Sequence, residues 1–328
     1  MEDLAENFNL LERDFFKKPI NNNSIQLVSG GFSSAKNYRI ADGEKTYLAR
    51  FMSAKQPLAS REKECLITAY VGKIGIGPKV YLQNPKQGIL LTDFIDGRLA
   101  SYDDMVNEPM RNLVIATIKK LHQPTEITFP KATTISSYIK TTLARIASNT
   151  VQQQLEVLDL VTPFNKLDLF EENNLATALI HNDLNPTNIL INKNQVYIID
   201  WTNAGFGDPF SDISWHAILF PITLHDTLLH YYFTDITTLM RQKLFCYYCL
   251  RLLLQAVWGI EQAKKLSPNY EQILIETLKQ NNSPEPHSLC RDIANHKIVS
   301  TNPKHLLLYA ASMLNSFAKL IKTGQFHA

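Results

Sequence analysis

A chain of 328 residues is longer than one ordinary domain, so we expect two lobes or one large domain. With 45% hydrophobic residues, 20% charged residues and a formal net charge of +2, the composition is that of a globular protein with a sizeable core. Lys and Arg residues are scattered along the chain, which excludes the basic patch that a nucleic-acid partner requires.

The cysteines and the apolar runs indicate the compartment. Four cysteines are too few for a disulfide framework in a chain of this length, so we expect a reducing environment. The first residues lack the basic and apolar regions of a signal peptide, and no apolar run reaches the roughly 18 residues of a membrane span. We therefore expect a cytoplasmic protein.

The Cys246-x-x-Cys249 spacing lies in an apolar helical pattern, and we interpret it as core.

The first part of the chain has a strand-rich pattern. One helix interrupts it, with Ser60 as the predicted N-cap. Gly, Asn and Pro separate the short β-favouring runs, which occupy residues 25–29, 37–41, 45–52, 79–83 and 88–94. Residues 1–24 have no assigned element.

After Gly97 the pattern changes to long helices. A strand pair around residues 178–200 interrupts the helices, which are predicted at residues 103–122, 135–160, 228–265 and 303–322. The sequence thus predicts an α+β, two-lobed fold. An antiparallel-sheet lobe covers residues 1–95, and a larger, mainly helical lobe covers residues 96–328.

Residues 179–201 carry the clearest chemical pattern. Two apolar runs flank a turn at residues 192–195, which predicts a β-hairpin. With the turn centred on Asn194, Asn188 and Asp200 are cross-strand neighbours on the order of 5 Å apart. Their hard oxygen ligands suit Mg²⁺. Asp183 precedes the first strand and would orient a hydroxyl beside the metal. Turn geometry alone explains any one of these residues, but not the ordered set.

The run His-Asn-Asp-Leu-Asn-Pro-Thr-Asn at residues 181–188, with Ile199-Asp200-Trp201, resembles the aminoglycoside phosphotransferase and choline kinase superfamily. These are small-molecule kinases with a protein-kinase-like fold. The chain lacks the Asp-Phe-Gly and Ala-Pro-Glu segments of protein kinases. The resemblance implies an enzyme that uses the cofactors ATP and Mg²⁺ to phosphorylate an alcohol group.

The resemblance also implies roles for residues of this loop. Asp183 would be the catalytic residue, and Asn188 and Asp200 would hold the metal. His181 and Asp212 would support the loop, although Asp212 could equally be the N-cap of the following helix.

An ATP site is implied upstream. Gly30 and Gly31 would let backbone N–H groups approach the phosphates, while a simple hairpin turn is the alternative. Arg50 takes the position of the phosphate-contacting Lys, with Glu64 as its partner; a solvated helix face is the alternative for Glu64. Backbone groups near three residues would bind adenine: Asp93, Phe94 and Ile95.

Substrate recognition is implied for the helical region. Trp258 resembles a choline kinase residue that encloses a quaternary ammonium group by cation–π attraction, and Trp201 could supply another wall. Aromatic residues at helical spacing are otherwise core. Thr202 and Asn203 replace the Glu-Tyr that choline kinases have after the metal Asp and an aromatic residue, so the usual acidic contact is missing.

We therefore expect a small-molecule hydroxyl substrate with a cationic group, such as choline or ethanolamine. The alternative is an aminoglycoside, whose amino groups would bind a set of carboxylates: Asp208, Glu261, Glu271 and Glu276. An alternative of another class is a catalytically silent nucleotide-binding protein.

Overall fold

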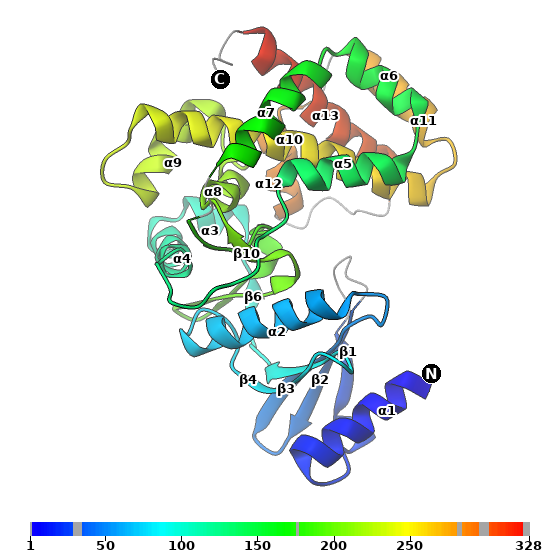
Figure 1. The fold of residues 1–328 in the computed structure, drawn as a ribbon, viewed down its shortest axis with the longest axis vertical. Helices are drawn as coiled ribbons and strands as arrows, with labels where there is room; N and C mark the ends of the chain where they lie inside the picture. The colour runs from blue at the N-terminus through cyan, green and yellow to red at the C-terminus, as the bar shows by residue number, and fades with distance from the viewer. Residues whose placement is uncertain (1, 29–34, 175–176, 281–283, 295–301, 324–328) are drawn as a thin grey trace.

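The computed structural model describes residues 2–28, 35–174, 177–280, 284–294 and 302–323 (Figure 1). They form a small N-terminal lobe around a β-sheet and a larger lobe of packed helices. The predicted two-lobed α+β fold is confirmed.

The N-terminal sheet is fully antiparallel, with strand order β1-β2-β3-β5-β4. Each strand begins and ends within one residue of its predicted bounds, because alternating apolar residues and turn residues mark both ends. The strands are β1 (Ile25–Val28), β2 (Lys36–Asp42), β3 (Lys45–Phe51), β4 (Val80–Asn84) and β5 (Ile89–Asp93).

A helix covers each face of this sheet (Figure 1). Helix α1 (Glu2–Leu11) and a π-helical turn (Glu12–Phe16), neither of which was predicted, pack on one face, where Phe8 contacts the rings of Tyr38 and Phe51. Helix α2 (Leu58–Lys73) covers the other face. It begins two residues before Ser60, with Pro57 at the N-cap position, so the predicted N-cap is wrong. The alternation along β3 turns Arg50 to the α2 side.

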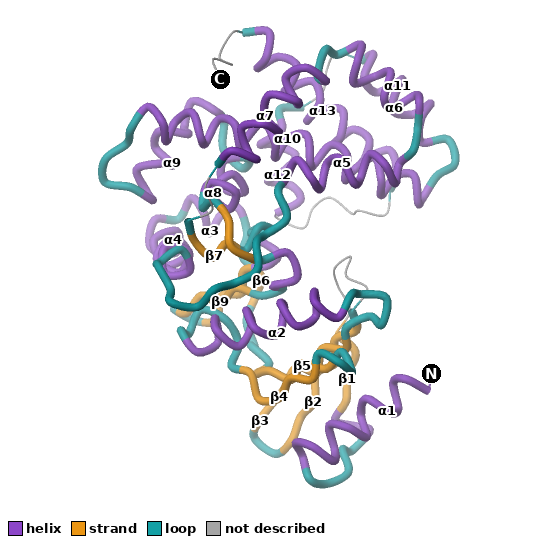
Figure 2. The backbone as a smooth tube through the Cα atoms, viewed as in Figure 1, coloured by secondary structure: helices purple, strands orange, loops and turns teal. Residues whose placement is uncertain are grey.

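The second lobe follows the segment after β5. Two small sheets, with strand orders β6-β8-β9 and β10-β7, lie next to the N-terminal lobe (Figure 2). Their strands are β6 (Arg98–Leu99), β7 (Ala178–Ile180), β8 (Ile189–Asn192), β9 (Gln195–Ile198) and β10 (Gly205–Gly207). The helices are α3 (Tyr102–Val106), α4 (Glu108–Leu121), α5 (Ile135–Ile146), α6 (Asn149–Val157), α7 (Val161–Asn173), α8 (Phe210–Ala217), α9 (His225–Tyr232), α10 (Thr238–Leu266), α11 (Tyr270–Lys279), α12 (Pro286–Ala294) and α13 (Pro303–Lys322).

Three predicted helices are interrupted. Asn107 ends α3 and caps α4, where Pro109 occupies the first turn. Ala147 has a left-handed backbone (φ +46), and Ser148 then caps α6. Residues 228–265 are split between α9 and α10, with Thr237 as the N-cap of α10. The predicted helix at residues 303–322 is confirmed as α13.

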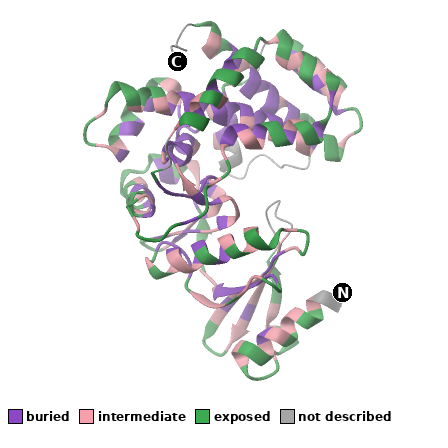
Figure 3. Cartoon of the chain, in the orientation of Figure 1, coloured by how far each residue is buried: buried purple, intermediate pink, exposed green. Residues whose placement is uncertain are grey.

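Helix α10 forms the centre of the larger lobe and packs against α5, α8 and α13 (Figure 3). By length and composition alone it could cross a membrane, but 78% of its most apolar window is buried inside the fold. The core helix of a globular protein has the same character.

Candidate active site

The catalytic loop begins where β7 ends, and its backbone is held from two sides. A carboxylate of α8 accepts its first two N–H groups: Asp212 Oδ2 lies 2.8 Å from the N–H nitrogen of His181, and Oδ1 lies 2.7 Å from that of Asn182. Asn182 has a left-handed backbone (φ +66), and its side chain donates to the carbonyl of Thr133. The loop is thus fixed in a conformation that a non-glycine residue adopts only at a cost.

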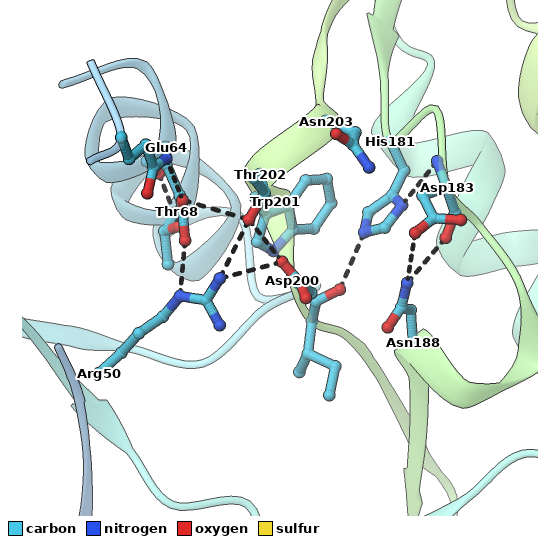
Figure 4. Close-up of polar contacts among 12 residues, drawn as sticks. Arg50, Glu64, Thr68, His181, Asp183, Asn188, Asp200, Trp201, Thr202 and Asn203 are labelled. Atoms are coloured by element: carbon cyan, nitrogen blue, oxygen red, sulfur yellow. Dashed lines mark hydrogen bonds and ion pairs between the residues drawn. The ribbon is translucent and has the colours of Figure 1, made fainter. Parts of the chain in front are cut away.

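His181 braces the loop from inside. Its Nδ1 accepts the N–H of Asp183 at 3.3 Å, so the proton is on Nε2, which donates to the carbonyl of Ile199 at 2.8 Å (Figure 4). The imidazole therefore ties the catalytic loop to the end of β9, and neither ring nitrogen is free to act on a substrate.

Asp212 lies in the first turn of α8 and accepts hydrogen bonds from other elements. His122, at the end of α4, contacts its Oδ2 at 3.0 Å. Burial raises the pKa of Asp212, but the hydrogen bond and charge of His122 and the N–H of His181 outweigh it, so the pKa is lowered. Asp212 is therefore ionised, and its carboxylate holds the backbone of the catalytic loop. Of its two predicted roles, this is loop support and not N-capping.

Asp183 faces a cavity beside two amide side chains. Asn185 Nδ2 lies 3.2 Å from its Oδ1, and Asn188 Nδ2 lies 3.4 Å from its Oδ2 and 2.8 Å from its carbonyl oxygen. Burial raises the pKa of Asp183, and the charge of Asp200 adds to that rise. A carboxylate with a raised pKa in a cavity is suited to accept a proton from a substrate hydroxyl.

The hairpin that follows has a different register from the predicted one. Strands β8 and β9 pair Asn192 with Gln195 around a two-residue turn, in which Lys193 has φ +53. The register is shifted by one residue, because the turn is centred between Lys193 and Asn194. Asn188 therefore faces Ile199, whose N–H donates to the Asn188 carbonyl at 2.9 Å. The predicted cross-strand pairing of Asn188 with Asp200 is wrong.

Asp200 nevertheless lines the same cavity as Asn188. Its backbone leaves the strand with φ +62, a strained conformation for a residue with a side chain. Thr202 Oγ1 lies 2.7 Å from its Oδ1, and Arg50 Nη2 lies 3.2 Å from the same atom. Burial raises the pKa of Asp200, but the charge of Arg50 and the hydrogen bond of Thr202 outweigh it and lower the pKa. Asp200 is therefore ionised at neutral pH.

Arg50 joins the two lobes at this point (Figure 4). Its Nε lies 2.7 Å from Glu64 Oε1 in an ion pair between β3 and α2, and its Nη2 reaches Asp200 and Thr202 of the second lobe. Glu64 is only 1% exposed, so the alternative of a solvated helix face is excluded.

The other residues expected at the nucleotide lie at the edge of the N-terminal lobe. Gly30 and Gly31 lie outside the described residues. At the end of β5, the N–H of Asp93 donates to the carbonyl of Lys79 and that of Phe94 to the carbonyl of Thr46. Within this trio, Ile95 has the only N–H group without a backbone partner in the described chain.

The cavity in front of Asp183 has a volume of about 490 Å³. The catalytic loop, α5, α8, α10 and α13 contribute to its wall, and so does Trp258, whose contact with a substrate stays a prediction. Trp201 does not. It is 2% exposed, packs against His181 and donates Nε1 to the carbonyl of Ile198, so its predicted substrate contact is wrong.

Sequence reasoning also missed residues that shape the site. Thr202 connects Arg50, Asp200 and Glu64 through its hydroxyl, and its place two residues after the metal-site Asp is the signal that could have found it. Arg251 lines the cavity from the middle of an apolar helix, where a single charged residue is the signal.

The donor set fits a magnesium ion. Asn188 uses its Nδ2 on Asp183, which leaves its amide oxygen for a ligand, and Asp200 supplies a carboxylate. Among the described residues, no cluster of three or more His, Cys, Asp or Glu side chains could hold a metal. Mg²⁺ requires no such cluster, since it is held by one or two protein oxygens together with phosphate and water.

Comparison with protein families agrees with this geometry. The model of the phosphotransferase enzyme family matches residues 24–244, which is more than half of the 328-residue chain. The chain therefore belongs to the phosphotransferase enzyme family, and the resemblance inferred from the motifs is confirmed.

Three similar proteins show how far the likeness extends. Protein LicA of Haemophilus influenzae is 24% identical over 164 residues, which make up 48% of this chain and 59% of that protein. The structure of choline kinase LicA from Streptococcus pneumoniae has a TM-score of 0.61 at 15% identity and covers 90% of this chain and 98% of that chain. The streptomycin–ATP–APH(2″)-IIa ternary complex has a TM-score of 0.53 at 19% identity, covering 78% and 93%. At these identities, the two structures show the shared fold.

Proposed function

We propose that the protein transfers the γ-phosphoryl group of ATP to a hydroxyl group of a small molecule. The observation that carries this proposal is that Asp183, Asn188 and Asp200 line one cavity, with Arg50 bound to Asp200 from the other lobe. Phosphoryl transfer depends mainly on positioning and on charge stabilisation, and this arrangement provides both.

Each residue has a role in this proposal. Asp183 orients the acceptor hydroxyl and takes its proton, a contribution typically worth about 10² to 10⁴ in rate. Asn188 and Asp200 would hold Mg²⁺, which supplies charge neutralisation on the phosphates. Arg50 contacts the phosphates of ATP, and adenine binds along residues 93–95. A catalytically silent protein is disfavoured because all three cavity residues are present.

For the acceptor, we propose an amino alcohol such as choline or ethanolamine. Trp258 in the cavity wall supports a cationic group, since an indole face attracts ammonium ions. The relation to LicA, whose Streptococcus pneumoniae form is a choline kinase, supports the same class.

An aminoglycoside acceptor has less support. Of the four carboxylates expected to receive its amino groups, only Glu261 belongs to the described cavity wall. Its Oε1 lies 2.5 Å from Nε of Arg145 in an ion pair. Asp208 is paired with Lys243 at 2.7 Å, and Glu271 accepts hydrogen bonds from Ser148 and Thr150. A polycation would have to displace these partners.

The proposal is tested by measuring ADP formation with Mg·ATP against choline, ethanolamine, thiamine and aminoglycosides. We expect turnover with an amino alcohol, and a loss of at least about 10²-fold in the Asp183→Asn variant. Rates that do not exceed those of the variant for any acceptor would refute the assignment.

A further inference from the structure

Arg251 is a buried cation on which the charges of Asp183, Asp212 and Glu171 act without a direct ion pair among the described residues. It lies on α10, is 1% exposed and makes no ion pair with any described residue. Its Nε donates to Ser214 Oγ at 3.2 Å, its Nη2 donates to the carbonyl of Ser211 at 3.0 Å, and its guanidinium carbon lies 4.5 Å from the centre of the Trp215 ring. Burial lowers its pKa to about 10, so it is charged at neutral pH.

One nitrogen of this guanidinium remains for a ligand. Nη1 makes no hydrogen bond with the described chain and is not fully enclosed by protein, so a ligand can reach it. Arg251 is part of the cavity wall, and Nη1 is its guanidinium nitrogen that the protein leaves for a ligand. The charges of Asp183, Asp212 and Glu171 offset part of the cost of burying this cation, and a ligand of opposite charge would complete its hydrogen bonds.

A second donor lies one helical turn away. Gln255 is also part of the wall, and residues four apart on a helix project from the same side. Its Oε1 accepts the hydroxyl of Tyr309 at 2.9 Å, which turns Nε2 away from that bond. Nε2 has no partner in the described chain and is not sealed from solvent. The cavity wall also contains apolar side chains, including Leu219 and Leu254.

We propose that Arg251 and Gln255 bind an oxyanion of the acceptor, and that the acceptor is a hydroxylated molecule carrying a carboxylate as well as an amino group. A guanidinium nitrogen and an amide nitrogen match the two oxygens of a carboxylate. The hydroxyl lies at Asp183, and Trp258 faces the ammonium group. The inference rests on the proposed kinase activity and narrows its substrate from amino alcohols to hydroxy amino acids and their N-methylated analogues.

The experiment compares an acceptor with its carboxylated relative: ethanolamine with serine, which differ by one carboxylate, and choline with carnitine, which differ by one carboxymethyl group. We expect the wild-type protein to have the higher kcat/KM for the carboxylated member of a pair. Arg251→Met should lower that value by about 10- to 100-fold, the range for losing a charge-assisted hydrogen bond. The value for the amino alcohol should fall by a smaller factor, because the charge of Arg251 also lowers the pKa of Asp183.

Two further variants keep the test decisive where Arg251→Met does not fold. Arg251→Lys keeps the charge without the planar fork, and Gln255→Leu removes the second donor; both should lower the carboxylate preference. Arg241→Met is the matched control, because Arg241 is on the same helix but pairs with Asp226 on the surface.

The outcomes distinguish an oxyanion of the acceptor from an oxyanion of the transferred phosphoryl group. An equal loss for both members of a pair would mean that Arg251 acts on Asp183 or on the transferred phosphoryl group and not on the acceptor, and would overturn the acceptor assignment. Turnover of amino alcohols alone, with no calorimetric binding of serine or carnitine, would also overturn it while leaving the kinase proposal intact. Absence of ADP formation with every acceptor would instead refute the proposed function.

Discussion

Asp212 is fully buried, and its charge is maintained by the groups that donate to it. Two backbone N–H groups of the catalytic loop and the imidazole of His122 contact its two oxygens. These bonds hold the loop only while the carboxylate accepts them, so the geometry of Asp183 depends on the ionisation of a residue that never contacts the substrate.

Asp212→Asn should lower the free energy of unfolding by about 1.5–3 kcal/mol near neutral pH, because hydrogen bonds to a charged acceptor are lost. The pKa of Asp212 in the folded protein is below its ordinary value of 3.8. Its contribution is therefore complete above that value and is lost as the pH falls through the folded pKa. Thermal melts between pH 7 and pH 3 should show the difference from wild type shrinking in acid.

Asp226→Asn is the control for this comparison, since Asp226 is 59% exposed and makes only a surface ion pair. A stability difference for Asp212→Asn that is constant over the whole pH range would contradict the role of the carboxylate charge.

Burial also raises the pKa of Asp183 above its ordinary value of 3.8. If the ionised form takes the proton of the acceptor, kcat should fall as the pH drops through this raised pKa, and the midpoint should lie above 3.8. The pH–rate profile of purified protein checks this expectation. A midpoint below the ordinary value would mean that another group controls the rate.

At the scale of elements, the ion pair between Arg50 and Glu64 fixes α2 against β3. The Glu64 side chain is buried, with 2% exposed, and the Arg50 side chain is partly buried, with 12% exposed. Arg50→Met leaves the buried Glu64 without its cation and should destabilise the protein by about 3–5 kcal/mol, whereas Glu64→Gln should cost less because Arg50 still pairs with Asp200. The double variant should lose less than the sum, as measured in a denaturant-unfolding cycle.

The surface pair of Lys18 and Asp42 provides the matched control, because the lysine side chain is 60% exposed. Lys18→Met should cost less than about 1 kcal/mol. Additive effects of Arg50→Met and Glu64→Gln would contradict a direct coupling between the strand and the helix.

The hairpin β8–β9 can be tested at its turn. Lys193 adopts a left-handed backbone that glycine tolerates better, so Lys193→Gly should raise the free energy of unfolding by roughly 0.5–1 kcal/mol. Asn194→Gly should not stabilise, because Asn194 is not left-handed. Chemical denaturation of both variants distinguishes the observed register from a turn centred on Asn194, for which the order would be reversed.

Most elements of the N-terminal lobe could be predicted, because strand alternation and turn residues are local signals. Helix breaks were harder to find. Ala147 adopts its left-handed conformation without the glycine that usually marks one, and the hairpin register depended on the same property at Lys193. Trp201 was misplaced because an aromatic residue next to a metal-site Asp looks the same in sequence whether it faces the cavity or the core.

At the scale of the molecule, Asp183, Asn188 and Asp200 lie close together in sequence, and this is why a motif could identify them. The acceptor cavity is different. Tyr138 on α5, Trp215 on α8, Arg251 on α10 and Tyr309 on α13 meet only after the helices have packed. Long-range packing of this kind leaves no local pattern, so the sequence predicted the reaction class better than the substrate.

Detection of the transferred group tests the central claim most directly. Purified protein is incubated with Mg·ATP and ethanolamine, choline, serine or carnitine, and the products are followed by phosphorus NMR. We expect a new phosphomonoester signal for at least one acceptor, formed with ADP in equal amounts, and none with Asp183→Asn or without Mg²⁺. ADP and free phosphate without a phosphomonoester, or a product that forms equally well in Asp183→Asn, would contradict phosphoryl transfer at this site.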